Sequence, residues 1–153
     1  MGADMEFDIR DRIVGTWKLV STEQTMNDGT TEPFTAYGPH AQGFLMYQRD
    51  GYMCAVLVNP DRQKLADPAH ATVEGKVAAA DGTFFYCGRY EIDVNQKAIV
   101  HIPEVASKPG YVGSHQIRPY ELDGDRLIFS DVEKHDPSIS RWKIVWERVR
   151  QNV

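Results

Sequence analysis

"RIVGTWKLVS", residues 12–21, places a glycine two positions before a tryptophan at the start of a strand-like stretch. The far end of the chain carries a second such stretch, "RWKIVWERV", residues 141–149. In a closed barrel of sequential strands the first and last strands pair, so these two stretches would lie side by side. Trp17 would then plug one end of the barrel, Gly15 would leave room for the chain to cross, and Arg148 would lie over the indole.

Short strands separated by turn signals occupy most of the chain. Turn residues stand at "NDG" (27–29), "RDG" (49–51) and "DGD" (123–125). Open edges in so long a meander would invite aggregation, and closure removes them. The sequence therefore predicts an all-β fold, an eight-stranded up-and-down antiparallel β-barrel. The strands are expected near residues 13–24, 41–48, 52–58, 83–94, 98–105, 114–122, 126–131 and 140–149.

One stretch has helical character, "DPAHATVEGKVAAA" at residues 67–80, between the third and fourth predicted strands. Asp67 suits an N-cap, Pro68 suits the first helical position, and alanines follow. Because Gly75 weakens the pattern, we expect one short helix. The chain has no long linker and no internal repeat, so residues 1–153 are predicted to form one domain, with the barrel at about 12–149.

Composition and motifs exclude several classes of function. The formal net charge of -5 argues against nucleic-acid binding, which needs a basic surface. No apolar run is long enough for a membrane span, and the polar start lacks a signal-peptide core, so a cytoplasmic protein is expected. Cys54 and Cys87 are expected to be free thiols. No metal-binding histidine spacing, phosphate loop or dinucleotide fingerprint occurs, so neither a metal nor a cofactor is predicted.

Four segments carry a resemblance to a known family: "GTWKLVS", "DGYMCAVL", "YCGRYEID" and "YVGSHQIRPYELDGDRL". They resemble the lipocalin-like domain family, the intracellular bacterial and fungal branch of the calycin superfamily, from about residue 12 to 149. The resemblance implies a barrel with an interior cavity for a small, largely apolar molecule. Some calycin-type barrels in biosynthetic pathways act as cofactor-free cyclases, isomerases or dehydratases.

Strand alternation predicts which side chains face the interior. With Trp17, Leu122 and Trp146 as inward anchors, the lining mixes aromatic, sulfur-containing and polar side chains, as ligand pockets do. The face of strand 98–105 stays open, because His101 and Glu104 lie on opposite sides of it. The residues predicted to contact a ligand are Ser21, Glu23, Tyr47, Met53, Glu104, Gln116, Tyr120 and Trp142.

Arg118 carries the sharpest signal among the predicted lining residues. An unpaired charge buried in a narrow barrel costs several kcal/mol, roughly, so an inward guanidinium needs a partner. That partner is Glu23, Glu104 or an anionic or enolate oxygen of a ligand; if the alternation is off by one residue, Arg118 is exposed instead. His101 is either a general base, since its ordinary pKa lies near neutral pH, or a core histidine held by one hydrogen bond.

Three functions are compatible with this sequence. The first is a cofactor-independent isomerase, cyclase or dehydratase acting on a small hydrophobic secondary metabolite, with Arg118, His101, Tyr86 and Tyr90 as its catalytic groups. The second is a non-catalytic carrier or sensor of a small hydrophobic molecule. The third is a filled barrel whose outer face binds a partner protein. The expected partner is a small hydrophobic molecule, without nucleic acid or membrane, and a homodimer is kept as an alternative to a monomer.

Overall fold

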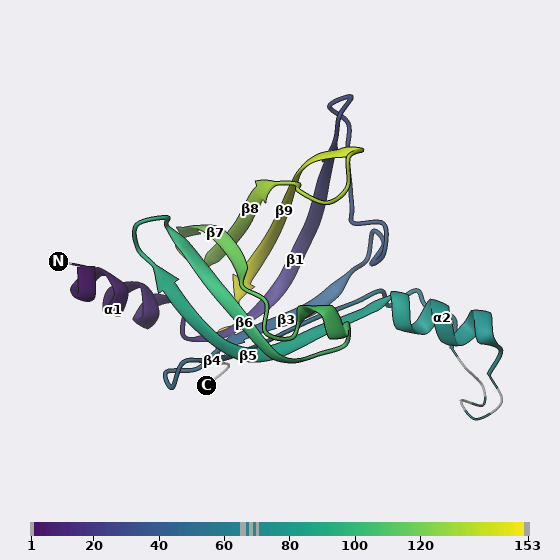
Figure 1. The fold of residues 1–153 in the computed structure, drawn as a ribbon, viewed down its shortest axis with the longest axis horizontal. Helices are drawn as coiled ribbons and strands as arrows, with labels where there is room; N and C mark the ends of the chain where they lie inside the picture. Colours follow the sequence, from purple (N-terminus) through teal and green to yellow (C-terminus); the bar gives the residue numbers. More distant parts are fainter. Residues whose placement is uncertain (1, 65–66, 68, 70, 152–153) are drawn as a thin grey trace.

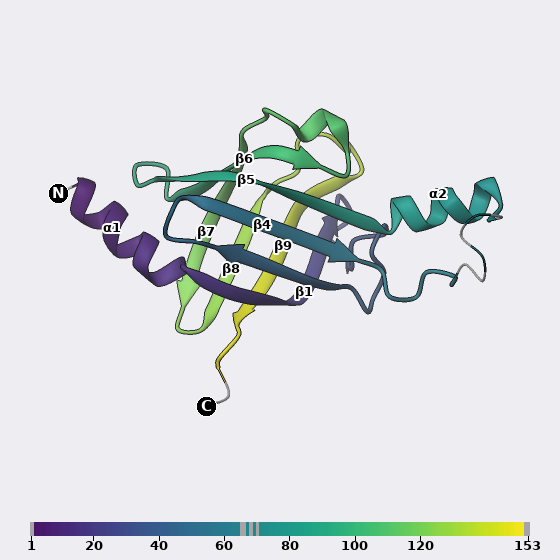
Figure 2. The same ribbon diagram turned by 90° about the horizontal axis from the view of Figure 1, so that it is seen from below.

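A closed barrel of eight antiparallel strands forms the centre of the molecule (Figures 1 and 2). The structure is a computed structural model that describes residues 2–64, 67, 69 and 71–151. Each barrel strand pairs with the next, and the last pairs with the first. The predicted all-β fold with an eight-stranded antiparallel barrel is confirmed, with one strand and two α-helices in addition among the described residues. The barrel strands are β1 (Gly15–Met26), β3 (Gln42–Tyr47), β4 (Tyr52–Val58), β5 (Thr83–Asp93), β6 (Ala98–Ala106), β7 (Gln116–Asp123), β8 (Arg126–Val132) and β9 (Ile139–Arg148).

One extra strand extends the sheet beyond the barrel. The short β2 (Thr31–Glu32) turns back on β1, where Glu32 pairs with Gln24. This strand was not expected, because two residues are too few to show alternation.

The floor of the barrel is built as predicted. Trp17 on β1 lies directly opposite Arg148 on β9, and the guanidinium carbon sits 4.3 Å from the centre of the indole. Trp17 is fully buried, and its ring N–H donates to the carbonyl of Ile13 at 2.8 Å. Gly15 has a φ of +128°, and a Cβ there would come within 3.0 Å of the Arg148 guanidinium. A side chain at position 15 would therefore displace the arginine that closes the floor.

A β-bulge in β1 overturns part of the predicted lining. The pairing of β1 with β9 shifts between Leu19 and Ser21. Because a one-residue slip exchanges the two faces of a strand, Thr22 and Gln24 become buried. Ser21 is exposed and Glu23 shares its outer face. The predictions that Ser21 and Glu23 face the interior are therefore wrong.

Strand β6 resolves the ambiguity left by its sequence. His101 is buried inside the barrel, whereas Glu104 is exposed and forms an ion pair with Arg89 at 3.2 Å on the outer face. A bulge lies opposite Cys87 and Gly88, and a Cβ on Gly88 would come within 2.2 Å of the β6 backbone. Of the two orientations left open for this strand, the one with Glu104 facing the interior is wrong.

An N-terminal helix, α1 (Gly2–Ile13), was not expected from the sequence. It projects away from the barrel (Figures 1 and 2). Its charges favour a helix, because Glu6 pairs with Arg10 one turn later at 3.4 Å and basic residues occupy the last turn. Ile13 is its buried residue. Without an apolar stripe, hydrophobic periodicity cannot reveal such a helix.

The second helix, α2 (Val73–Asp81), directly precedes β5 and is shorter than the predicted 67–80. Its N-cap is Thr72, whose hydroxyl oxygen accepts from the Gly75 N–H at 3.1 Å. The expected cap, Asp67, lies before the helix, and Pro68 lies outside the described residues. Like α1, α2 extends beyond the barrel (Figure 2).

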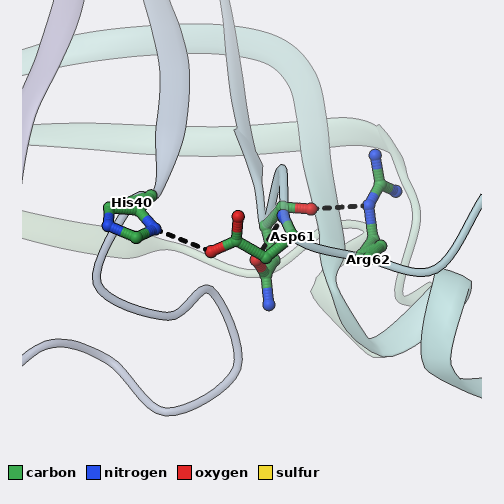
Figure 3. A network of polar contacts seen from close by, with 4 residues as sticks. His40, Asp61 and Arg62 are labelled. Carbon is green, nitrogen blue, oxygen red and sulfur yellow. Dashed lines mark hydrogen bonds and ion pairs between the residues drawn. The ribbon is translucent and has the colours of Figure 1, made fainter.

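A polar network ties the connection before β3 to the loop after β4 (Figure 3). His40 Nδ1 lies 2.8 Å from Asp61 Oδ2, and the Arg62 Nε–H donates to the Asn59 carbonyl at 2.8 Å. The His40 side chain is 71% exposed. A polar contact this open to water contributes little stability, so we interpret the network as a loop tether.

Candidate functional site

A pocket of about 760 Å³ occupies the end of the barrel opposite the Trp17 floor. The end of β8 and the beginnings of β7 and β9 form its walls, together with the connections that carry Phe34 and Tyr111. Its volume lies within the usual range for small-molecule sites. The lining residues are Gln24, Phe34, Lys108, Gly110, Tyr111, His115, Gln116, Ile117, Arg118, Asp131, Val132, Glu133, Lys134, His135, Ile139, Trp142 and Ile144.

Arg118 on β7 faces this pocket and is partly buried. Its guanidinium carbon lies 5.4 Å from the centre of the Trp142 indole, and Nη2 donates to Gln116 Oε1 at 3.4 Å. It forms no ion pair with any described carboxylate, and the two glutamates predicted as partners, Glu23 and Glu104, lie on the outer face. The Arg118 guanidinium therefore keeps N–H groups available for a hydrogen bond to a ligand.

A chain of hydrogen bonds fixes the orientation of the Gln116 amide. Gln116 Nε2 donates to the Ser114 hydroxyl at 2.9 Å, and that hydroxyl donates to the Tyr111 carbonyl at 2.6 Å. With its NH₂ group engaged by the loop, the amide turns its carbonyl oxygen toward Arg118. The loop before β7 thus positions the guanidinium on one wall of the pocket.

The opposite wall depends on the bulge in β1. The Phe34 N–H donates to the Thr22 hydroxyl at 3.1 Å, and Gln24 Nε2 donates to Glu32 Oε1 at 2.8 Å. The Thr22 hydroxyl, which accepts, and the Gln24 amide, which donates, both face the interior because of the register shift. These bonds hold the 33–38 connection over the barrel mouth and bring the Phe34 ring into the pocket.

Asp131 on β8 contributes a carboxylate to the same pocket. It lies opposite Trp142 in the β8–β9 pairing, and its side chain is 25% exposed beside Lys134, whose ammonium is 3.5 Å away. Continuing the β7–β8 register from Tyr120 opposite Phe129 by two residues sets Asp131 beside Arg118. A carboxylate and a guanidinium thus share one pocket.

A buried tyrosine–histidine–tyrosine cluster lies deeper in the barrel. The Tyr47 hydroxyl is 2.5 Å from His101 Nε2, and the Tyr86 hydroxyl is 2.6 Å from His101 Nδ1. Burial holds the pKa of His101 well below its ordinary value, and the Arg118 charge lowers it further. The imidazole is therefore neutral, so one tyrosine donates to it while the other accepts its N–H.

Arg118 connects this cluster to the pocket. Burial raises the pKa values of Tyr47 and Tyr86, and the Arg118 charge opposes both shifts. Tyr111, a lining residue, stacks on Tyr86 with ring centres 6.2 Å apart. His101 does not line the pocket and has both ring nitrogens occupied, so it holds Tyr86 in place behind Arg118.

The structure separates the predicted site residues into four groups. Those that line the pocket are Gln116, Arg118 and Trp142; those of the cluster behind it are Tyr47, Tyr86 and His101. Those buried inside the barrel but away from the pocket are Met53, Tyr90 and Tyr120. The Tyr90 hydroxyl donates to the Gln48 carbonyl. Those on the outer face are Ser21, Glu23 and Glu104.

Several lining residues escaped prediction. Asp131 could have been found, because it continues the inward alternation of Leu127 and Phe129 along β8. Gln24 faces the interior only because of a bulge that the sequence does not mark. Phe34 and Tyr111 lie outside the barrel strands, where strand alternation gives no orientation.

Metal and membrane sites were sought in the described part of the chain. There, no group of three or more histidine, cysteine, aspartate or glutamate side chains is placed to hold a metal ion. In the same residues, no helix combines the length and the apolar character needed to cross a membrane.

A family model for a lipocalin-like domain matches residues 14–149, which include all eight strands of the barrel. The chain belongs to the lipocalin-like domain family. Searches of curated proteins and of solved structures gave no match. A lipocalin-like barrel with a pocket at one end suits a small hydrophobic ligand.

Proposed function

We propose that the pocket binds one small, largely apolar molecule that carries an anionic or enolate-type oxygen, and that Arg118 holds this oxygen. The observation that carries the proposal is a partly buried guanidinium without a carboxylate partner among the described residues. Removing a charge from water is costly unless it is paired. Asp131 shares the pocket, but its carboxylate forms its ion pair with Lys134 at 3.5 Å. A ligand oxygen would pair with the guanidinium directly.

The remaining lining supports an apolar body for this ligand. Phe34, Tyr111, Trp142 and Ile144 surround the pocket with aromatic and aliphatic surface. Gln116 restrains the guanidinium from one side and the Trp142 ring supports its face. This combination of apolar walls with a few fixed polar groups is typical of small-molecule sites.

Two related fluorescent probes test the proposal. Anilinonaphthalene sulfonate is anionic, and N-phenylnaphthylamine is a neutral molecule of similar shape. We expect Arg118→Ala to weaken binding of the anionic probe by about 10- to 100-fold, because it removes a charge-assisted hydrogen bond. Binding of the neutral probe should change little. Equal loss of both probes, or of neither, would contradict a charge-specific role.

A matched control is available on the outer face of the same barrel. Arg89→Ala removes an arginine that pairs with Glu104 in solvent. This variant should bind both probes like the wild type. A loss of anionic binding in Arg89→Ala equal to that in Arg118→Ala would mean that overall charge, not the pocket, attracts the probe.

Catalysis is the second candidate, because Asp131 and Arg118 line one pocket. Isomerisations, cyclisations and dehydrations can begin with removal of a proton beside a carbonyl, and Asp131 would accept it while Arg118 stabilises the resulting oxyanion. Acid–base groups suffice for this step. In this catalytic hypothesis the base is Asp131, not His101 as the sequence suggested. Tyr86 and His101 keep Arg118 in place. Tyr90 lies away from the reacting atoms.

Proton abstraction from a nitrobenzisoxazole tests this second candidate, because the reaction needs one base and yields a phenolate. We expect measurable turnover in the wild type and a loss of about 100- to 1000-fold in Asp131→Asn or in Arg118→Ala. Probe binding by Asp131→Asn should persist. A wild type that binds the anionic probe through Arg118 but gives no turnover is a carrier or sensor.

A further inference from the structure

The two cysteines of the chain lie directly opposite each other on neighbouring strands, away from the pocket. Cys54 on β4 pairs with Cys87 on β5, within a run of seven consecutive pairs that has no register shift. Met53 and Tyr86, which precede them along their strands, are buried inside the barrel. By alternation both thiols therefore lie on the outer face. Both are free; Cys54 is exposed and Cys87 is partly exposed.

The backbone hydrogen bonds between β4 and β5 define the kind of pair that the cysteines form. Hydrogen-bonded and non-hydrogen-bonded pairs alternate along an antiparallel ladder. At one end of this ladder the Tyr90 N–H donates to the Gly51 carbonyl at 2.9 Å. At the other end the Asn59 N–H donates to the Gly82 carbonyl at 2.8 Å. The cysteine pair lies three positions from the first bonded pair and five from the second, so it is a non-hydrogen-bonded pair.

Side chains approach each other most closely at such positions. Opposite Cβ atoms on antiparallel strands are about 4.5–5.5 Å apart, with the shorter separations at non-hydrogen-bonded pairs. A disulfide joins Cβ atoms about 3.5–4.5 Å apart. The two thiols already interact, because burial and, after it, a hydrogen-bonding contact with Cys54 raise the pKa of Cys87 to about 12. A bond between the two sulfurs therefore needs little movement of the backbone.

We propose that Cys54 and Cys87 form a reversible oxidation site, in which a hydroperoxide converts the two thiols into a disulfide between β4 and β5. Cys54 reacts first, because it is exposed and because the raised pKa of Cys87 keeps that thiol protonated. The Cys54 thiolate attacks one peroxide oxygen. The S–O bond forms, the O–O bond breaks, and the departing oxygen takes up a proton and leaves as water or as an alcohol.

The second step closes the disulfide. The Cys87 sulfur attacks the sulfur of the Cys54 sulfenic acid, so the S–S bond forms and the S–O bond breaks. The Cys87 proton and the sulfenic hydroxyl leave together as water. In total the two thiols are oxidised by two electrons and one peroxide is reduced. Two molecules of a small thiol such as glutathione reverse the change by thiol–disulfide exchange and are themselves joined.

Peptide mapping of the wild type after treatment with hydrogen peroxide tests the proposal. We expect both thiols to be lost, Cys54 and Cys87 to be joined within one chain, and both thiols to return in dithiothreitol. Three results would each overturn the proposal: thiols that persist, Cys54 oxidised to the sulfinic acid beside an unchanged Cys87 thiol, or a disulfide between two chains.

A matched control moves one thiol by two residues along the same face. In the double variant Cys54→Ser with Val56→Cys, the new cysteine lies opposite Phe85 and diagonal to Cys87. Diagonal neighbours are about 7–8 Å apart, which is too far for a disulfide without movement of the strands. We expect this variant to form the intramolecular disulfide at least about 10-fold more slowly than the wild type. Equal rates would show that the pairing of the cysteines is not what favours the bond.

A measurement on the wild type alone tests the same geometry. In glutathione buffers, we expect the equilibrium constant for disulfide formation to be at least about 30-fold larger in the folded protein than in urea, because a fold that holds two thiols together is itself stabilised by the bond. Equal constants in the two states would mean that the fold does not bring the thiols together, and would overturn the proposal whatever the variants do.

Discussion

Each end of the barrel holds an arginine over a tryptophan, and the two pairs are built differently. At the floor, Arg148 lies 4.3 Å from the Trp17 ring centre; at the mouth, Arg118 lies 5.4 Å from that of Trp142. The floor guanidinium also donates to the carbonyls of Val14, at 3.0 Å, and Arg12. The mouth guanidinium has one long hydrogen bond to an amide oxygen and a hydrogen-bonding contact with the Tyr86 hydroxyl, and it reaches no main-chain carbonyl among those described.

The difference lies in the acceptors around the cation. Two main-chain carbonyls accept hydrogen bonds from Arg148, and Trp17 beneath it is fully buried, so this pair stabilises the fold. Arg118 keeps free donors beside a pocket, an arrangement that costs stability and is expected where a protein binds something. The same two residue types thus serve structure at one end and, in our proposal, recognition at the other.

Replacing the tryptophans should give the largest contrast. Trp17→Ala should lower the free energy of unfolding by about 3–5 kcal/mol, because it opens a cavity in a closed core. Trp142→Ala at the half-buried mouth should cost about 1 kcal/mol, since water can fill the space. Urea denaturation followed by circular dichroism measures both. Equal losses would mean that the mouth is packed as tightly as the floor.

Replacing the arginines should give a smaller contrast. Arg148→Ala should cost about 2 kcal/mol, because it removes charge-assisted hydrogen bonds and leaves carbonyls without donors. Arg118→Ala should change stability by less than about 0.5 kcal/mol or raise it. A double-mutant cycle adds a sharper test, since Arg148→Ala and Trp17→Ala should couple. Strictly additive losses would show that the two floor residues do not support each other.

The floor could be predicted from sequence because its signals are local. A glycine and tryptophan at the start of the first strand, with an arginine at the end of the last, suffice once the barrel is assumed closed. Arg118 was placed correctly for a related reason. The anchor Leu122 lies on the same strand, and β7 pairs with β8 without a register shift.

The rest of the mouth could not be predicted in the same way. The alternation of side chains between the two faces of a strand holds only as far as the next bulge. Because of the register shift after Leu19, Ser21 and Glu23 face outward and Gln24 faces inward. The helix α1 was missed because its charges, not an apolar stripe, favour it. His101 was recognised as a candidate. Its hydrogen bonds to Tyr47 and Tyr86 could not be predicted, because these tyrosines are 54 and 15 residues away in sequence and lie on other strands.

The two ends should also differ in their response to acid, which gives the smallest expected effect. The Trp17–Arg148 pair contains no histidine, whereas His101 lies behind the mouth with its pKa held well below the ordinary value by burial. Below about pH 6.5 the unfolded chain takes up a proton at this histidine and the folded protein does not. Stability therefore rises with pH in this range and falls as the solution is acidified.

The size of this acid effect can be stated for one step of pH. Between pH 6.5 and 5.5 the wild type should lose about 1 kcal/mol through His101, and a His101→Gln variant should lose that much less over the same range. Urea denaturation at the two pH values measures the difference, and His115→Gln, which alters an exposed histidine, is the control. Because the wild type and His101→Gln differ only at position 101, the carboxylates contribute to both alike and do not mask the difference. If His101→Gln and the wild type lost stability in parallel, the imidazole would be protonated in the folded state, and the Tyr47 and Tyr86 hydroxyls would both have to accept from it. Arg118 would then face a second buried cation, and its need for an anionic ligand would be greater still.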